Sequence, residues 1–276
     1  MTLLALATGD GGLVDPEASV LRADDEALLR GRGAFETLRV YEGRPFRLDE
    51  HLDRLYASAA SIGLPVLERE EFGRLAELVL PAAGEEDAVL RFIWTAGSVG
   101  EGATALALLS DVPRELEDLR SRGSRIVSLL GVRAAVPWLL PGVKSTSYAV
   151  NMAAEAEAKR QGADDAIFVD ADGIVLEGTV TNVWWRVGET LSTPSLELGI
   201  LAGVTRRAVV ELAAGRGYEV SEGVFPLSDV LEAEEAFTSS SVRELMPIVD
   251  LDGHRLALGP AAHELQEDLR ALARSG

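Results

Sequence analysis

The chain has 276 residues, an apolar fraction of 47%, a formal net charge of −19 and no cysteine. A chain of this length buries a substantial core in one large domain or two small ones. The lack of cysteine excludes disulfides, thiolate metal sites and cysteine nucleophiles. The excess of acids disfavours nucleic acids and anionic membranes as partners, because both attract positive charge. No apolar run reaches the ~18 residues that cross a bilayer, so we expect a soluble, cytoplasmic protein.

The first part of the chain alternates strand and helix patterns. Its start, MTLLALATGDGG, lacks the basic residues of a signal peptide and is interpreted as a first strand. The next predicted elements are two strands over 33–48 joined at Glu42-Gly43, helices over 48–64 and 68–84, and strands over 88–97 and 104–112. Antiparallel strands with intervening helices indicate an α+β domain.

A polar, charged run over 113–123, beginning at Pro113 and ending in a glycine, is typical of a boundary. We therefore predict a small N-terminal α+β domain over 1–112, a linker over 113–123 and a larger C-terminal domain over 124–276. The elements expected after this boundary are a strand over 124–132, a helix over 147–161, two strands over 164–178, a helix beginning near Thr205, and a strand, hydroxyl-rich loop and strand over 235–253.

Lys144 is the first candidate for chemistry. The chain has only two lysines, and Lys159 lies among glutamates as a surface lysine does. Lys144 instead follows an apolar run without a nearby acid, where a lysine pKa is readily lowered and the amine can act as a nucleophile or form a Schiff base.

Two further segments suit a phosphate. In AGVTRRAVV, a glycine-containing loop precedes a helix start at Val204 and Thr205, where backbone N–H groups favour an anion. The TSSSV segment adds consecutive hydroxyls that include Ser240 and Ser241. Taken alone, the first segment is better explained as a plain helix cap, and the second is explained equally well as an ordinary polar turn.

Glu177 ends an apolar strand, where a carboxylate needs a partner, although an exposed turn acid is the plainer interpretation. A protonated ring nitrogen would serve as that partner. Lysine, phosphate cradle and ring-nitrogen partner are together the three requirements of pyridoxal 5′-phosphate (PLP), with generic phosphate binding as the alternative. The three histidines are widely separated, so no metal site is expected.

Four segments resemble the class IV aminotransferases, the fold type IV family of PLP enzymes. They are FETLRVYEGRPFRLDEHLDRLYASA, KSTSYAVNMAAEAEAKRQGADDAIFVDADGIVLEGTVTN, LAGVTRRAVVELA and FTSSSVRELMPIVDLDG. They occur in the family's order and cover nearly the whole chain. The resemblance implies a two-domain α+β / α/β fold with PLP in the interdomain cleft, and a homodimer.

The resemblance also assigns roles to individual residues. Lys144 matches the lysine that binds PLP covalently and moves the substrate proton, and Glu177 matches the acid that keeps the pyridine nitrogen protonated. The positions matching phosphate ligands or other cofactor contacts are Arg54, Val204, Thr205, Ser240, Ser241, Asn182 and Tyr148. Phe35 and Glu36 would line the substrate side. The loop SVGEGATA lacks the arginine and histidine that bind the substrate carboxylate in bacterial D-alanine enzymes. Arg32, Arg39, Arg91 or Arg133 could replace them, although a surface arginine is the favoured interpretation of any one of these four.

The resemblance leaves the reaction open. The leading hypothesis is an aminotransferase that moves an amino group from a D-amino acid or (R)-amine to an α-keto acid. The first alternative is 4-amino-4-deoxychorismate lyase, which releases 4-aminobenzoate and pyruvate, and the segment PWLLPGVKSTSYAVNMAA resembles actinobacterial proteins of that kind. An L-branched-chain aminotransferase comes third. A PLP- or phosphate-binding protein without turnover would leave Lys144 and Glu177 unexplained.

Overall fold

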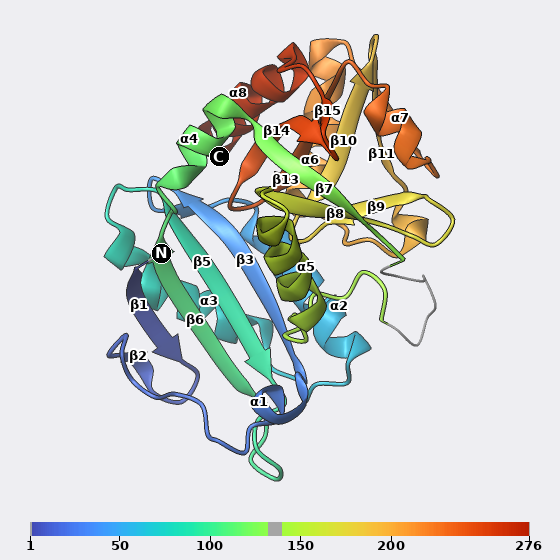
Figure 1. Cartoon of the computed structure of the whole chain (residues 1–276). Helices are drawn as coiled ribbons and strands as arrows, with labels where there is room; N and C mark the ends of the chain where they lie inside the picture. The colour runs from blue at the N-terminus through green and yellow to red at the C-terminus, as the bar shows by residue number, and fades with distance from the viewer. Residues whose placement is uncertain (1, 132–139, 276) are drawn as a thin grey trace. The chain divides into compact units, whose positions relative to one another are not determined.

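The computed structural model describes residues 2–131 and 140–275. Its contacts divide the chain into two compact units, one of Met1–Pro113 with Val143–Tyr148, and one of Arg114–Gly142 with Ala149–Gly276. Each unit combines helices with a sheet (Figure 1). The predicted boundaries did not anticipate that the segment Val143–Tyr148 belongs to the first unit. This segment contains Lys144, and its contacts are mainly with residues of that unit.

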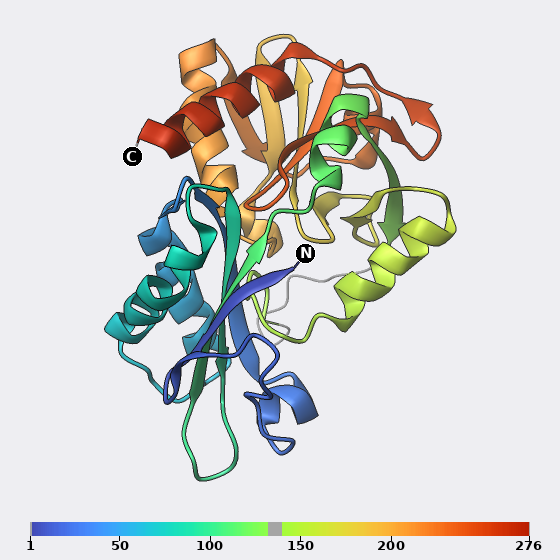
Figure 2. The same ribbon diagram turned by 90° about the vertical axis from the view of Figure 1, so that its left-hand side faces the viewer.

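The first unit contains a six-stranded antiparallel sheet in the order β2-β1-β6-β5-β3-β4. Helices α2 and α3 cover one face of this sheet (Figure 2). The elements are β1 (Leu3–Thr8), β2 (Gly12–Val14), α1 (Glu26–Arg30), β3 (Gly33–Tyr41), β4 (Arg44–Pro45), α2 (Leu48–Ser61), α3 (Arg69–Val79), the 3-10 helix η1 (Leu80–Ala83), β5 (Ala88–Thr95) and β6 (Thr104–Asp111).

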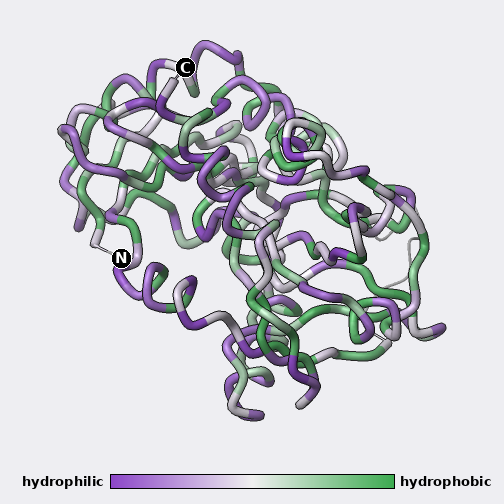
Figure 3. Tube along the Cα trace, turned by 90° about the horizontal axis from the view of Figure 1, so that it is seen from above, coloured by the Kyte–Doolittle hydropathy of each residue, from purple (hydrophilic) through white to green (hydrophobic). Residues whose placement is uncertain are grey.

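Alternation along β3 and β5 explains how the sheet uses its two faces. Leu38 on β3 and Phe92 on β5 are fully buried in one apolar cluster with Leu55 of α2 and Phe72 of α3. Successive strand residues point to opposite faces, so Phe35 lies on the face away from these helices. Hydrophilic and hydrophobic residues alternate along the coiled stretches of the chain (Figure 3), as they do in amphipathic helices.

The second unit contains a nine-stranded mixed sheet with the path β12-β11-β10-β13-β14-β7-β8-β9, and β15 pairs with β14. Helices α6 and α8 pack together on β13 and β14, and α5 packs on β7 and β8. The elements are α4 (Glu115–Arg122), β7 (Ser124–Leu130), α5 (Ala149–Arg160), β8 (Asp165–Val169), β9 (Val175–Gly178), β10 (Asn182–Val187), β11 (Thr190–Pro194), η3 (Leu196–Leu198), α6 (Val204–Ala213), η4 (Ala214–Arg216), β12 (Glu219–Gly223), α7 (Leu227–Leu231), β13 (Glu235–Ser240), β14 (Glu244–Leu251), β15 (His254–Arg255) and α8 (Pro260–Ser275).

Most elements expected from the sequence are confirmed. The β3–β4 hairpin turns at Glu42 and Gly43, whose φ values of 50° and 78° are the left-handed conformation of a type I′ turn. The helix expected from residue 147 begins at Ala149, because the preceding residues pair with β3 instead.

The range 113–123, predicted as a linker, contains helix α4. Acids occupy its first turn and arginines its last, which complements the helix dipole. Arg120 also donates hydrogen bonds to the carbonyl oxygens of Arg243 (2.8 Å) and Leu245 (3.1 Å), at the start of β14. The polar composition of this range therefore belongs to an anchored surface helix.

A buried carboxylate connects β13 to the first turn of α8. Glu235 is 1% exposed, pairs with Arg186 and accepts hydrogen bonds from the N–H groups of Ala261 (3.1 Å) and Ala262 (3.4 Å). The two N–H groups have no partner within the helix at this position, so the carboxylate supplies one. Gly259 leaves room for it, since a Cβ there would lie 2.2 Å from the Glu235 carboxyl carbon.

We expect Glu235→Ala to lower the free energy of unfolding by about 3 kcal/mol, because it removes the buried carboxylate that pairs with Arg186 Nε and leaves two helix N–H groups without their acceptor. Urea unfolding followed by circular dichroism measures this. The matched control is Glu234→Ala, since Glu234 contacts the same Arg186 at 2.7 Å but is half exposed. Glu234→Ala should lower the free energy of unfolding much less than Glu235→Ala. Equal decreases in both variants would contradict the role given to Glu235.

Candidate functional site

Lys144 is fixed in the first unit by backbone contacts. Its carbonyl oxygen accepts a hydrogen bond from the N–H of Phe35 (3.1 Å), and its own N–H donates to Ser58 Oγ on α2 (3.1 Å). The next residue, Ser145, forms an antiparallel bridge with Ala34. The segment that carries the lysine is therefore held beside the start of β3.

The side chain of Lys144 lies against two aromatic rings. Its Nζ is 4.5 Å from the ring centroid of Phe35 and 5.9 Å from that of Tyr148. These two rings pack edge to face with centroids 5.2 Å apart. Such faces attract a cationic amine and restrict its position. The structure thus brings together three residues that the sequence assigned separately to the catalytic, cofactor-binding and substrate-binding sets.

Glu36 has a different setting from the substrate-lining one that the sequence suggested. Its side chain is fully buried on the α2 side of the sheet, where Arg54 Nε and Nη2 lie 2.6 and 2.8 Å from its two carboxylate oxygens. His51 Nδ1 lies 2.8 Å from Oε2 and donates to it. Arg54, the predicted phosphate ligand, is thereby oriented by a carboxylate from the neighbouring strand.

The charges in this group shift two pKa values. Burial alone would raise the pKa of Glu36, but the charge of Arg54 and the hydrogen bonds from Arg54 and His51 outweigh it and lower the pKa to about 2. Burial lowers the pKa of His51, against the opposing influence of Glu36. Glu36 is therefore ionised and His51 neutral at pH 7.

In the second unit, a chain of hydrogen bonds holds Glu177. Its Oε2 accepts from the N–H of Leu201 (2.9 Å), and the carbonyl oxygen of Leu201 accepts from Asn182 Nδ2 (2.9 Å). Asn182 in turn lies against Gly203, where a Cβ would be only 2.1 Å from Asn182 Oδ1. Only glycine therefore fits between the asparagine and the start of α6.

The predicted phosphate segments come together in this unit. Helix α6 begins at Val204, and both Val204 and Thr205 are buried. The capping residue, Gly203, has no side chain that could hydrogen-bond to the N–H groups of the first turn. Antiparallel pairing places Asn182 of β10 opposite Ser239, directly before Ser240 and Ser241. Helix α6 packs against β13. The helix start, the asparagine and the serine segment are thus parts of one arrangement, anchored to the loop that holds Glu177.

Two residues of these groups were missed by sequence reasoning. Leu201 acts through its backbone, which leaves no signal in the residue type. His51 does leave one, because it stands three residues before Arg54 on α2, and residues at this spacing share a helix face. Both residues position a predicted functional group.

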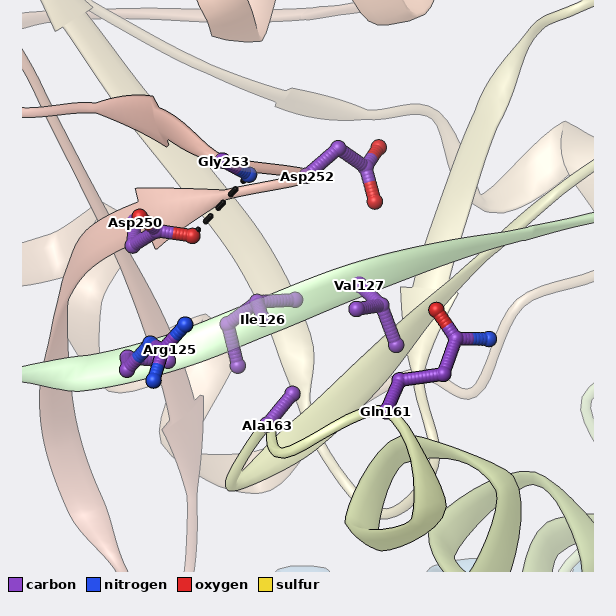
Figure 4. A pocket seen from close by; sticks show the side chains of 8 residues that line it. All are labelled: Arg125, Ile126, Val127, Gln161, Ala163, Asp250, Asp252 and Gly253. Carbon is purple, nitrogen blue, oxygen red and sulfur yellow. Dashed lines mark hydrogen bonds between the residues drawn. The ribbon is translucent and has the colours of Figure 1, made fainter.

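A hollow of about 310 Å³ lies elsewhere in the second unit, lined by Arg125, Ile126, Val127, Gln161, Ala163, Asp250, Asp252 and Gly253 (Figure 4). It contains none of the predicted site residues. Asp250 accepts from the N–H of Gly253 (3.0 Å), and Asp252 accepts from the N–H and hydroxyl of Ser128. Both acids are thus used in hydrogen bonds at and beside the turn at Asp252 and Gly253.

The four arginines considered as ligands for a substrate carboxylate have different settings. Arg32 and Arg39 form ion pairs with acids of the first unit, at 2.5 and 3.1 Å respectively. Arg91 is half-buried on β5, and its Nε donates to Thr37 Oγ1 at 3.2 Å. Arg133 lies outside the described residues.

The part of the chain that the structure describes contains no group of three or more histidine, aspartate or glutamate side chains placed to hold a metal ion. Within the same residues, no helix has the length and apolar character needed to cross a membrane.

Comparison with known proteins places the chain in a family. Residues 33–251 match the model of the class IV aminotransferases. A bifunctional aminodeoxychorismate lyase / D-amino acid transaminase of Mycobacterium tuberculosis is 35% identical over 95% of this chain and 96% of its own length. A putative branched-chain-amino-acid aminotransferase of Methanocaldococcus jannaschii is 34% identical, over 88% of this chain and 87% of its own.

The fold of the chain is also similar to that of a solved aminotransferase structure. The PLP-bound form of a hypothetical aminotransferase from Mycobacterium tuberculosis superposes with a TM-score of 0.91 at 34% identity, covering 98% of this chain and 99% of that one. The chain belongs to the class IV aminotransferase family. It is a PLP-dependent enzyme, and the predicted fold class is confirmed.

The Glu36 group predicts how stability depends on pH. The pKa of Glu36 falls from an ordinary 4.5 to about 2, so its contribution is complete above about pH 4.5 and is lost as the pH falls toward 2; the shift corresponds to roughly 3 kcal/mol. His51 must stay neutral, so its contribution is lost as the pH falls below its ordinary pKa of 6.5.

Urea midpoints measured between pH 7 and pH 3 should therefore decrease in two stages. Glu36→Gln should lower the midpoint at pH 7 and reduce the decrease below pH 4.5, whereas His51→Gln should reduce the decrease just below pH 6.5. If Glu36→Gln and the wild type lose stability in parallel below pH 4.5, the carboxylate is not the titrating group.

Proposed function

We propose that this enzyme is a transaminase that takes an amino group from a D-amino acid or (R)-amine and passes it to an α-keto acid. The observation that carries the proposal is the placement of Lys144 Nζ against Phe35 and Tyr148, on a segment tied to β3. The D-amino acid activity in the name of the 35%-identical relative supports the choice of donor.

The residues present fit PLP. The amine of Lys144 suits its carbonyl group, and the start of α6 offers backbone N–H groups to a phosphate. Thr181, near Glu177 in sequence, has a buried hydroxyl without a hydrogen-bond partner among the described residues, which is a donor and acceptor that a ligand could use. The remaining residues proposed to hold the cofactor are Arg54, Tyr148, Glu177, Asn182, Val204, Thr205, Ser240 and Ser241.

When bound, PLP supplies a reactive carbonyl carbon and a ring that accepts the electron pair released at the substrate α-carbon. The protein would supply proton transfer and charge. Lys144 Nζ would remove the proton from the substrate α-carbon and deliver it to the former carbonyl carbon of the cofactor. Glu177, fixed by the N–H of Leu201, would keep the ring nitrogen protonated. Arg54, oriented by Glu36, would bind the phosphate.

A second candidate is aminodeoxychorismate lyase, which is also part of the name of the same relative. Both reactions begin with removal of the α-proton by Lys144. They differ in what leaves afterwards, since the lyase expels pyruvate and releases 4-aminobenzoate. We also propose a homodimer, as the resemblance implies, and a cytoplasmic location, as the composition suggests. Sedimentation of the holoenzyme tests the dimer.

The substrate class is tested by adding D-alanine, and separately L-leucine, to the PLP-loaded enzyme without an acceptor. We expect D-alanine to bleach the absorption band of the lysine-bound cofactor and to release pyruvate in proportion to the enzyme. Bleaching by L-leucine alone would replace the proposal with a branched-chain enzyme. Release of 4-aminobenzoate from aminodeoxychorismate without a keto acid would establish the lyase.

Lys144→Arg tests the catalytic lysine. Arginine keeps the positive charge but cannot bond covalently to the cofactor or transfer the proton, so we expect loss of the absorption band and a decrease in kcat of roughly 10³-fold or more. The chain provides a matched control in Lys159→Arg, since Lys159 is exposed on α5 and pairs with Glu155. Retention of the band in Lys144→Arg would assign the Schiff base to another amine.

A further inference from the structure

Asp165 is a buried carboxylate of the second unit that stands outside the groups described so far. It is the first residue of β8 and is 3% exposed. Its Oδ1 accepts hydrogen bonds from Thr179 Oγ1 (2.6 Å) and from the N–H of Ala166 (2.8 Å). Its Oδ2 pairs with the guanidinium of Arg243. Both oxygens are thus satisfied, as the burial of a carboxylate requires.

Thr179 connects this carboxylate to the loop between β9 and β10. The loop lies directly between Glu177 and Asn182, both of which are predicted to contact the cofactor. Thr179 is itself buried, and its carbonyl oxygen accepts a hydrogen bond from Asn151 Nδ2 on α5. Contacts on two sides of Thr179 therefore fix the backbone of this loop.

Arg243 connects the same carboxylate to the serine turn, which is formed by residues 240–243 between β13 and β14. The N–H of Arg243 donates to Ser240 Oγ (3.3 Å), and its carbonyl oxygen accepts from Arg120 Nη2 on α4 (2.8 Å). The turn carries Ser240 and Ser241, both predicted to contact the cofactor. Because the guanidinium at the end of this turn pairs with Asp165, the ion pair fixes the turn relative to β8.

We propose that Asp165 is a positioning residue for the cofactor, because through Thr179 and Arg243 it holds the β9–β10 loop and the serine turn at a separation that suits one PLP molecule. The inference rests on the cofactor site proposed above and adds a residue that acts through others. Groups that bind a ligand precisely must be held within about 0.5 Å of their places by the residues behind them. A buried, fully satisfied polar network provides such rigidity.

The test asks whether loss of the Asp165 charge alters recognition of the cofactor phosphate or only stability. PLP and pyridoxal, which lacks the phosphate, are titrated separately into the full-length apoenzyme, and the absorption band of the lysine-bound cofactor reports binding. In Asp165→Asn, the preference for PLP over pyridoxal should fall roughly 10-fold, the lower end of what outer-shell partners contribute at metal sites. Asparagine can still accept from Thr179 but no longer neutralises Arg243.

Two further substitutions probe the same network while keeping the ion pair, and they carry the test if Asp165→Asn does not fold. Thr179→Val removes the hydroxyl that Asp165 accepts from and should reduce the preference for PLP. Thr179→Ser keeps that hydroxyl and should restore the preference. If Thr179→Val retains the full preference of the wild type, the network does not position the cofactor and the inference is wrong.

The matched control is Glu235→Gln. Glu235 is an equally buried carboxylate of the same sheet that also pairs with an arginine, but its other contacts are with α8. Glu235→Gln should lower the urea midpoint without changing the preference for PLP over pyridoxal. If Asp165→Asn behaves in the same way, Asp165 has only a structural role and the inference is overturned.

These binding ratios separate the inference from the proposed function. If the wild type prefers PLP and Asp165→Asn loses that preference, the role of Asp165 holds even when no amino donor is consumed, and only the proposed reaction fails. A wild type that binds pyridoxal as tightly as PLP would overturn the inference, since the serine turn would then not hold a phosphate.

Discussion

The first half of the candidate site depends on the pairing of one buried carboxylate with one guanidinium. Glu36 is enclosed by the sheet and α2, and it is tolerated there because Arg54 and His51 together satisfy both of its oxygens. The same contacts fix the direction of the Arg54 side chain. A fully buried carboxylate thus determines the orientation of Arg54, the predicted phosphate ligand.

Strand alternation then assigns neighbouring residues to separate tasks. Glu36 points to the helix-covered face, while Phe35 and Thr37 point to the other, where Lys144 and Arg91 lie. A single strand therefore carries a buried ion pair on one face and a partly buried group of aromatic and cationic side chains on the other. In the second unit the backbone of Leu201 links Glu177 to Asn182, so that two residues predicted to contact the cofactor are positioned by one loop.

The sequence predicted the elements well because their patterns are local. Apolar spacing, the Glu42-Gly43 turn and the glycine before α6 each determine structure within a few residues. The setting of Glu36 was not predictable in this way, since its partners come from a different element and periodicity cannot reveal which strand residue a helix will face. The prediction of a linker over 113–123 did not include α4, because polarity describes exposure and does not distinguish a loop from a surface helix. The sequence also could not show which of the arginines predicted to bind a substrate carboxylate already form ion pairs with acids of the protein, because such contacts depend on the fold.

Because the segment Val143–Tyr148 belongs to the first unit, the polypeptide cannot be divided into the two units by a single cut. The chain passes between the two units at Pro113, at Gly142 and again after Tyr148. Neither unit is a continuous segment, and residues 1–113 alone would lack Lys144, the predicted catalytic lysine, together with the segment that pairs with β3. Proteolysis at a single exposed position therefore cannot release an intact half. Gene fusion, circular permutation or fragment complementation of this enzyme must preserve three crossings rather than one.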